Sequence, residues 1–512
     1  MIQNKETERQ RQIMQEELDK AKSFDERNKL GQYATPFVLA DAILKHSKIF
    51  ISEKEHIRFL DPSIGTGSFY SALLSNYDEA QITKAVGFEI DRHYAEPAIN
   101  LWASSSIIYN IGDFTKAKAP KSQSEKFNLI VCNPPYVRHH HINEQKTYLQ
   151  EAALKAANIH LSGLSGLYCY FIALSHKWMS KDGISVWLIP SEFMEVNYGE
   201  AIRKYLTTEV TLLQIHRFDP NDVQFKDALV TSSVIWFKNK KPSKNHTVRF
   251  TYGGDLLNPS RNKDISIKVL AAESKWTRFP LNGAKSTNNC ATLKDFFEVK
   301  RGIATGDNKY FILSKSEIIK RDLPFQFFKP ILPSPRHLKN DIIYADNEGN
   351  PVLDKQLYLL NCSASIEEIE KHPTLFRYIQ EGVEKKVSER YLCKGRKSWY
   401  FQEEREESIF YFTYMGRSDS TDKKVFRFIL NYSKAIVTNS YLILYPKQNL
   451  RTILMQQPHH IKTIYEILNN ITNATMLEEG RIYGGGLHKM EPKEFMNLPV
   501  QELEEWISSI DQ

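Results

Sequence analysis

The first half of the sequence predicts an α/β fold with a doubly wound, mostly parallel sheet, and two observations lead to this prediction. Short apolar runs, each about the length of one strand, alternate with helix-length segments. These runs are apolar throughout, which is typical of strands that helices cover on both faces. In such sheets ligands bind beyond the carboxyl ends of the strands, so functional residues are expected at those ends.

The elements follow one another in a regular order. Residues 3–30 are rich in charge and lack proline and glycine, so they predict a solvated helix. The motif GQYATP, residues 31–36, comes next, and its proline is well placed to begin the amphipathic helix FVLADAILKH. Beyond it we expect helices at SFYSALL and at residues 167–180, and strands within HIRFLDPS, KAVGFEID, SIIYNIGDF, FNLIVCNPPY, ISVWLIP, EVTLLQIHRF and TSSVIWF.

Length and composition narrow the class of protein. A chain of 512 residues is too long for one ordinary core and indicates two or three domains. The net charge of +7 permits a polyanionic partner. Five scattered cysteines without a CxxC pair indicate a reducing compartment. Since the first residues lack the apolar core of a signal peptide, and no apolar run approaches the roughly 20 residues of a membrane span, we expect a cytoplasmic protein without a membrane partner.

The alternating pattern fades after IWFKNKKPSKNHT, a lysine-rich segment that predicts a boundary near residue 245. The remainder has short β-like runs, helical patches and clusters of basic and aromatic residues, which predict an α+β domain. We therefore expect an N-terminal helical extension, an α/β domain, a connecting segment and a C-terminal domain, at residues 1–30, 31–245, 246–290 and 291–512.

Acidic residues stand at the first three strand ends. The segment DPSIGTGSF places Asp61 before a glycine-rich turn that lacks both the third glycine of a dinucleotide fingerprint and a Walker lysine. An acid there would repel a phosphate and suits a ligand with a positive amine, such as S-adenosylmethionine. Glu89 in GFEID could accept the two ribose hydroxyls, and Asp113 in NIGDF could accept an adenine amine. Taken alone, the glycine-rich turn could serve only to bring a strand close to a helix, and Glu89 or Asp113 could each be a solvated strand-end acid. Together the three acids predict a site for a nucleoside joined to an amino acid.

The fourth strand ends in NPPY, residues 133–136, a tetrapeptide that by itself predicts only a turn. Its position beside the three acids gives it a chemical meaning. An exocyclic base amine is a poor nucleophile because its lone pair is delocalised into the ring. The side-chain oxygen of Asn133 and the carbonyl of Pro134 could each accept one proton of such an amine and localise the lone pair. Tyr136 could stack on the base.

Three nearby features have plainer interpretations. Cys132 precedes NPPY but points to the other face of its strand, so we expect it in the core. Phe225 is expected in the core as well, with a second wall for the stacked base as the alternative. Adjacent histidines in RHHH, residues 138–141, cannot all reach one ion from a regular element, so no metal site is expected.

The order GQYATP, DPSIGTGSF, GFEID, GDF and NPPY, followed by a late phenylalanine and a long C-terminal domain, resembles the gamma-class adenine-N6 DNA methyltransferases of bacterial restriction–modification systems, the TaqI type. The resemblance spans most of the chain. In the second half, VKRGIATGDNKYFIL and YGGGLHK resemble segments of that family's target recognition domain. The resemblance implies a Rossmann-like methyltransferase domain at residues 31–245 and a DNA target recognition domain at residues 291–512.

The resemblance also implies a division of labour among the motif residues. The cofactor S-adenosylmethionine would be held by Tyr33, Thr35, Asp61, Pro62, Gly65, Gly67, Glu89 and Asp113. A flipped target adenine would be held by Asn133, Pro134, Pro135, Tyr136 and Phe225.

The expected activity is methylation of adenine N6 in double-stranded DNA, which would protect that DNA in a restriction–modification system. We expect a monomer that acts separately from any cognate restriction endonuclease. Two alternatives remain open. The chain could be a methyltransferase of the same NPPY class that acts on RNA or protein glutamine, or a non-catalytic DNA specificity subunit.

Overall fold

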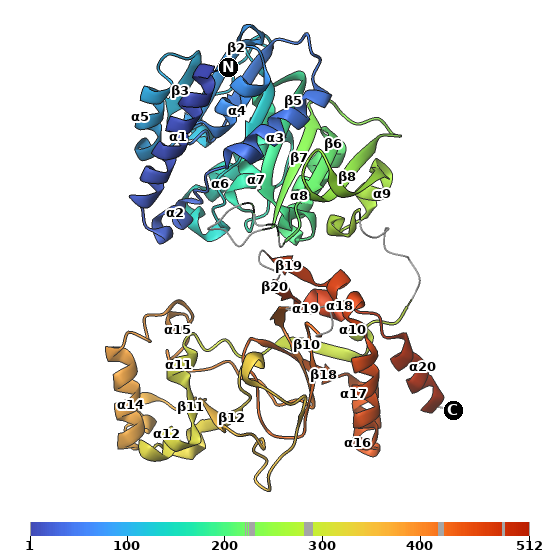
Figure 1. Cartoon of the computed structure of the whole chain (residues 1–512). Helices are drawn as coiled ribbons and strands as arrows, with labels where there is room; N and C mark the ends of the chain where they lie inside the picture. The colour runs from blue at the N-terminus through green and yellow to red at the C-terminus, as the bar shows by residue number, and fades with distance from the viewer. Residues whose placement is uncertain are drawn as a thin grey trace. The chain divides into compact units, whose positions relative to one another are not determined.

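The computed structural model describes the chain apart from residues 1, 221, 223, 225–230, 281–289, 418–423, 484–486 and 511–512. The chain divides into two compact units (Figure 1). The first is formed by Met1–Ser286 and Tyr483–Gly485, and the second by Thr287–Ile482 and Gly486–Gln512. Within the described residues no helix is both long and apolar enough to span a membrane.

The first unit is built on a single large sheet. In its described part, nine strands are arranged in the order β3-β2-β1-β4-β5-β7-β6-β8-β9. Strands β1 to β5 are all parallel, whereas β7 runs antiparallel to both β5 and β6. The strands are β1 (Ile57–Asp61), β2 (Ile82–Glu89), β3 (Ile107–Ile111), β4 (Phe127–Cys132), β5 (Met179–Pro190), β6 (Thr211–Arg217), β7 (Ser232–Lys238), β8 (Thr247–Gly254) and β9 (Pro259–Ser266).

Helices cover both faces of this sheet, as strand β4 shows. Its side chains alternate between two cores: Ile130 and Cys132 lie in one, and Leu129 and Val131 in the other. Each core is closed by residues from different helices, so the strand has no solvated face. The helices are α1 (Ile2–Lys20), α2 (Phe24–Leu30), α3 (Phe37–Ser47), α4 (Ser68–Asn76), α5 (Arg92–Leu101), α6 (Lys146–Ala157), α7 (Leu167–Ser175), α8 (Glu200–Thr208) and α9 (Ile267–Ala272).

The prediction of a doubly wound α/β fold is confirmed, and all seven expected strands are present. Three details differ from expectation. The segment 3–30 forms two helices, α1 and α2, instead of one. Helix α7 ends at Ser175, because the long strand β5 already begins at Met179. Finally, residues 246–290, expected to connect the two domains, contribute β8, β9 and α9 to the first unit, since β8 buries Val248 and Phe250 and pairs with β6.

The second unit mixes small sheets with short helices, which agrees with the expected α+β class. A five-stranded sheet has the order β10-β18-β15-β17-β13, and two three-stranded sheets have the orders β11-β14-β12 and β16-β20-β19. The strands are β10 (Phe297–Arg301), β11 (Ile312–Ser314), β12 (Phe328–Ile331), β13 (Ile342–Ile343), β14 (Leu357–Leu360), β15 (Phe410–Thr413), β16 (Met415–Arg417), β17 (Phe428–Asn431), β18 (Tyr441–Pro446), β19 (Arg481–Tyr483) and β20 (Leu487–Lys489).

The helices of the second unit are mostly short. They are α10 (Leu293–Phe296), α11 (Asn308–Phe311), α12 (Lys315–Lys320), α13 (Ile366–Ile369), α14 (Pro373–Glu384), α15 (Tyr391–Lys394), α16 (Gln448–Gln456), α17 (His460–Asn470), α18 (Asn473–Glu479), α19 (Pro492–Met496) and α20 (Gln501–Ile510). Alternate residues of β15 lie in two different cores, Phe410 and Phe412 in one and Tyr411 in the other, so the five-stranded sheet is packed on both faces. A further core contains residues of the sheet β11-β14-β12.

Candidate active site

A cavity of about 780 Å³ lies at the carboxyl ends of β1 to β4. Its position is the one that the parallel arrangement of these strands favours for a ligand. Most of the residues singled out from the sequence line it, and they come from four strand ends and the GQYATP segment. These residues are Tyr33, Thr35, Asp61, Pro62, Gly65, Glu89, Asp113, Asn133 and Pro135. The described lining does not include Gly67, Pro134 or Tyr136.

The two glycines of the turn after β1, Gly65 and Gly67, have different surroundings. Gly65 lines the cavity at φ +55°, and a Cβ added there would meet nothing within 4 Å. Gly67 has φ +95°, and its Cβ would lie 2.7 Å from Nε1 of Trp102 and 2.8 Å from the hydroxyl of Tyr109. Gly67 therefore lets helix α4 begin close against two aromatic side chains, while Gly65 leaves open space on the cavity side.

Glu89 is held at both carboxylate oxygens. Its Oε2 accepts a hydrogen bond of 3.0 Å from the backbone N–H of Gly65, and its Oε1 accepts one of 2.8 Å from the N–H of Asp91. The carboxylate of Asp61 accepts from the N–H of Ser63 at 3.0 Å. The turn after β1 and the end of β2 are thus joined through one side chain, which fixes the two acids beside each other.

Burial disfavours the ionised form of both acids. It raises the pKa of the Asp61 carboxyl to about 8 and that of Glu89 to about 7, and the negative charge of Glu89 adds to the effect on Asp61. A cationic ligand, or one that donates hydrogen bonds, would stabilise the charged forms. The electrostatics of the cavity therefore favour a ligand with a positive group near Asp61 and hydroxyl donors near Glu89.

Asn133 is oriented by two hydrogen bonds from its amide nitrogen. Nδ2 donates to the carbonyl of Tyr33 at 2.9 Å and to Oγ1 of Thr35 at 3.0 Å. The other amide atom, Oδ1, is buried and has no hydrogen-bond partner within the described residues. A buried acceptor without a partner costs roughly 1–3 kcal/mol. Because Asn133 lines the cavity, a donor on a bound ligand would satisfy this oxygen.

Tyr136 is not part of the described lining of the cavity, although its neighbours Pro135 and Val137 are. Its hydroxyl donates to the carbonyl of Leu188 at 3.0 Å, and its ring centroid is 6.0 Å from that of Tyr33 at a tilt of 38°. Its backbone N–H donates to the carbonyl of Gly31 at 3.3 Å, so the GQYATP and NPPY segments are joined directly. A Cβ at Gly31 would lie 2.5 Å from that nitrogen, which explains a glycine at this position.

Asp113 has a structural partner as well as a place in the cavity. Its Oδ1 accepts from the N–H of Thr115 at 2.9 Å and from the hydroxyl at 2.7 Å, which caps the short 3₁₀ helix Phe114–Lys116. The other oxygen lies 3.6 Å from Nζ of Lys116. Phe225, the expected second wall for a base, lies outside the described residues.

A cysteine, Cys132, and the histidines of RHHH lie near the site. Cys132 is fully buried in the core, as expected, and burial raises the pKa of its thiol well above the ordinary value. The histidines form the 3₁₀ helix His139–His141, and His141 reaches the cavity lining. In the part of the chain that the structure describes, no three histidine, cysteine or acidic side chains cluster as metal ligands would.

Two family models match this chain and together cover most of it. The model of the Eco57I restriction-modification methylase matches residues 64–224, which include the strand ends around the cavity. The model of the type II methyltransferase M.Eco57I, C-terminal domain, matches residues 273–512. The chain belongs to the type II restriction–modification methyltransferases.

Named type II methyltransferases resemble this one along nearly its whole length. The type II methyltransferase M.AccI of Acinetobacter calcoaceticus is 27% identical over 500 residues, covering 94% of this chain and 87% of the relative. M.XamI of Xanthomonas campestris pv. amaranthicola is 25% identical over 456 residues, covering 87% of this chain and 81% of the relative. The methyltransferase assignment therefore applies to both units of the chain.

Solved structures agree on the fold. The type IIL restriction-modification enzyme MmeI, determined in complex with DNA, has a TM-score of 0.50 at 13% identity over 85% of this chain. The DrdV–DNA complex has a TM-score of 0.52 at 11% identity over 94% of this chain. This methyltransferase spans 65% of the MmeI chain and 57% of the DrdV chain, so both of those proteins are considerably longer.

The structure adds lining residues to this methyltransferase's cavity that the sequence reasoning missed. Arg11, Gln15 and Asp19 of helix α1 all reach it, and so do Phe88, Phe114 and Phe171. The first three are spaced four residues apart, which places them on one face of a helix. The spacing of four residues was the only sign of this shared face in the sequence. Because the whole segment is rich in charged residues, the same spacing is also typical of a solvated helix face.

Proposed function

We propose that this protein methylates the N6 amine of adenine in double-stranded DNA, with S-adenosylmethionine as the methyl donor. One observation carries the proposal. The amide of Asn133 is fixed by Tyr33 and Thr35 so that its oxygen is left as a buried acceptor at the cavity. An exocyclic amine is the kind of donor that this oxygen lacks, and family membership supports the class of reaction.

The cavity residues fit the proposed cofactor. S-adenosylmethionine would supply an activated methyl group when bound. Asp61 would face its positively charged amino-acid end, and Glu89 would accept from the ribose hydroxyls. The raised pKa of both acids is consistent with these roles, because a bound cation or hydrogen-bond donor would stabilise the ionised carboxylates. Gly65 would leave room for the ligand at the turn. Asp113 would contribute through the carboxylate oxygen that does not cap the turn.

The NPPY segment would hold the target base. Oδ1 of Asn133 and the carbonyl of Pro134 would accept the two amine protons, and the ring of Tyr136 would stack on a base that has left the duplex. Tyr33 and Thr35 would contribute to binding of the cofactor and would also act indirectly on the base. Both accept hydrogen bonds from Nδ2 of Asn133, which leaves Oδ1 free to accept a proton of the target amine. Phe225 is proposed as the opposite wall.

The second unit would recognise the DNA sequence. This assignment is supported by the match of residues 273–512 to the C-terminal domain of a type II methyltransferase. Basic and aromatic clusters such as CKGRKSWYFQ suit contacts to phosphates and bases. We also propose that the protein acts as a cytoplasmic monomer, separately from a cognate endonuclease.

The test compares wild type with Asn133→Ala in transfer of labelled methyl groups to duplex DNA, followed by single-molecule sequencing of the product. The wild type should mark adenine within one sequence motif. Asn133→Ala should lose at least about 100-fold in rate, comparable with the loss of one hydrogen-bond partner in other active sites, and should still bind S-adenosylmethionine. Asn76→Ala is the control, because the Asn76 amide bonds to Asp41 and Ala72 away from the described cavity lining.

The same assay separates the alternatives. Methyl transfer to RNA or protein but not to DNA would replace the proposed substrate. Specific DNA binding without transfer to any substrate would indicate a non-catalytic subunit. Full activity in Asn133→Ala would refute the proposed role of the NPPY segment.

A further inference from the structure

The wall of the cavity formed by helix α1 is attached mainly by polar contacts. Among residues 5–20, only Glu8 and Arg11 are fully buried, and both are charged. Arg11 is paired with Glu8 and donates to Oγ1 of Thr66 at 3.0 Å, and Thr66 donates to Gln15 at 2.6 Å. The helix packs against α4 and α5 (Figure 1). With so little apolar surface to hold it, its attachment depends on a few named side chains.

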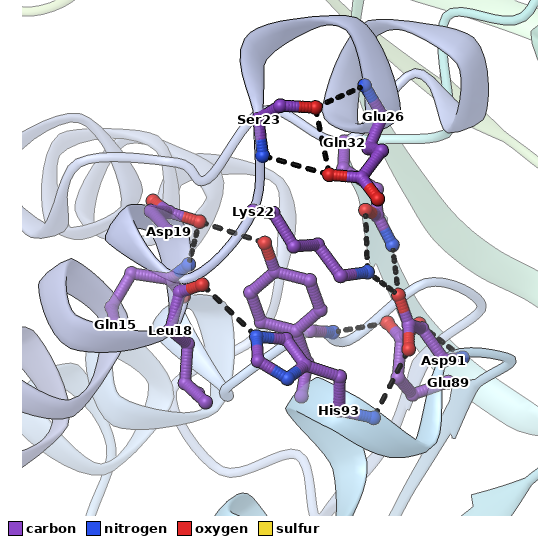
Figure 2. A network of polar contacts seen from close by, with 12 residues as sticks. Gln15, Leu18, Asp19, Lys22, Ser23, Glu26, Gln32, Glu89, Asp91 and His93 are labelled. Carbon is purple, nitrogen blue, oxygen red and sulfur yellow. Dashed lines mark hydrogen bonds and ion pairs between the residues drawn. The ribbon is translucent and has the colours of Figure 1, made fainter.

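A further attachment lies just after the helix, at Lys22. Its ammonium group forms an ion pair with Asp91, and both side chains are mostly buried, at 17% and 16% exposure (Figure 2). The same carboxylate oxygen accepts from Nε2 of Gln32 at 2.8 Å, and Lys22 also contacts Gln32 at 3.4 Å. Gln32 belongs to the GQYATP segment, so this network joins three segments that surround the cavity.

Asp91 is bonded directly to Glu89, a residue of the proposed cofactor site. Its backbone N–H donates to Oε1 of Glu89, and its Oδ1 accepts from the N–H of His93 at 3.0 Å, which caps helix α5. Figure 2 shows Lys22, Asp91 and Glu89 in sequence across this network. Displacing Asp91 would therefore release one of the two bonds that hold Glu89.

A second set of contacts joins the end of α1 to the start of α5. The hydroxyl of Tyr94 donates to Oδ1 of Asp19 at 2.8 Å. The ring of His93 bonds to the carbonyl of Leu18 at 2.9 Å (Figure 2). The ammonium of Lys22 also lies 5.0 Å from the centre of the Tyr94 ring. The end of α1 is thus anchored to the start of α5, immediately beside the acid of β2.

We propose that Lys22 is a positioning residue for cofactor binding: by pairing with Asp91 it fixes the Glu89 carboxylate and holds helix α1 closed as a wall of the cavity. This inference rests on the proposed function, because it assumes that the cavity binds S-adenosylmethionine. Because the Lys22–Asp91 pair helps to hold this wall in place, it would slow the escape of a bound cofactor.

The test measures cofactor binding by the full-length protein rather than its activity. Affinity and dissociation rate for S-adenosylmethionine and S-adenosylhomocysteine are compared in wild type, Lys22→Ala and Lys22→Arg. Lys22→Ala should bind roughly tenfold more weakly, mainly through faster dissociation, since a hydrogen bond between charged groups is lost. Lys22→Arg should recover most of the affinity. Lys20→Ala is the matched control, because Lys20 is exposed at the end of the same helix.

Hydrogen exchange adds a readout that a merely structural lysine would not change. Amides of residues 5–20 should gain protection when wild type binds the cofactor and should gain less in Lys22→Ala at equal saturation. Unchanged affinity and dissociation in Lys22→Ala, or an equal loss in Lys20→Ala, would overturn the inference while leaving the proposed function intact. Failure of the wild type to bind either ligand would overturn the proposed function, and this inference with it.

Discussion

At the scale of single residues, two buried acids make the stability of the ligand-free protein depend on pH. The pKa of Asp61 is raised to about 8 and that of Glu89 to about 7, whereas an unfolded chain has carboxyl pKa values near 4. Between about pH 4 and pH 8 the folded state therefore binds more protons than the unfolded state. The free energy of unfolding should consequently fall as the pH rises through this window.

Asp61→Asn should remove the Asp61 part of this dependence, because the amide does not ionise. The decrease in Tm between pH 5 and pH 9 should be smaller in the variant than in wild type, by roughly 2–4 °C for each kcal/mol removed. Calorimetry at a series of pH values without ligand measures both curves. Curves of the same shape would show that the Asp61 carboxyl is already ionised in the empty cavity.

At the scale of one element, the two glycines of the turn before helix α4 should affect different properties of the protein. We expect Gly67 to matter mainly for the stability of the fold and Gly65 mainly for cofactor binding. Gly67→Ala would place an L residue at φ +95° with its Cβ against the buried Trp102 and the buried hydroxyl of Tyr109. Left-handed strain and overpacking together should lower the free energy of unfolding by about 2–4 kcal/mol. Denaturant unfolding with S-adenosylmethionine absent measures this loss.

Gly65→Ala is the natural counterpart in the same turn. Its Cβ would meet no neighbour, so the expected loss of stability is only about 1–2 kcal/mol from the left-handed backbone, while the methyl group would protrude on the cavity side and weaken cofactor binding. A larger stability loss in Gly65→Ala than in Gly67→Ala would contradict this division.

At the scale of the whole molecule, the boundary of the first unit decides which fragment can fold. A fragment ending at residue 245 would lack strands β8 and β9 and helix α9, and with them a set of core side chains: Val248, Phe250, Ile265, Ile267, Leu270, Trp276 and Phe279. Burial of each such side chain contributes roughly 1.5–3 kcal/mol. Their combined loss is comparable with the roughly 5–15 kcal/mol total stability of a domain.

Residues 1–286 should therefore fold cooperatively and bind S-adenosylmethionine without recognising a DNA sequence, whereas residues 1–245 should aggregate or unfold. Size-exclusion chromatography, thermal melting and calorimetric titration of both fragments check this expectation. Equal stability of the two fragments would show that β8 and β9 are dispensable additions to the sheet.

Much of the fold could be predicted because its signals are local. Continuous apolar runs specified the seven expected strands, and the glycine-rich turn and NPPY marked strand ends that the structure brings to one cavity. The segment 246–290 could not be assigned in the same way. Its strand β9, PSRNKDIS, is largely exposed at the sheet edge and has almost no apolar pattern, so only pairing with β8 identifies it.

By itself the sequence determined the fold class, the family resemblance and nine of the residues that line the cavity, since each depends on residue types at fixed short spacings. Only the tertiary structure decided how those residues are used. It turned the amide of Asn133 by bonds to Tyr33 and Thr35, about a hundred residues away in the chain, and it placed Gly67 outside the described cavity lining. It also joined Lys22 to Asp91 across 69 residues. Such contacts are set by the packing of distant segments, which no local pattern encodes.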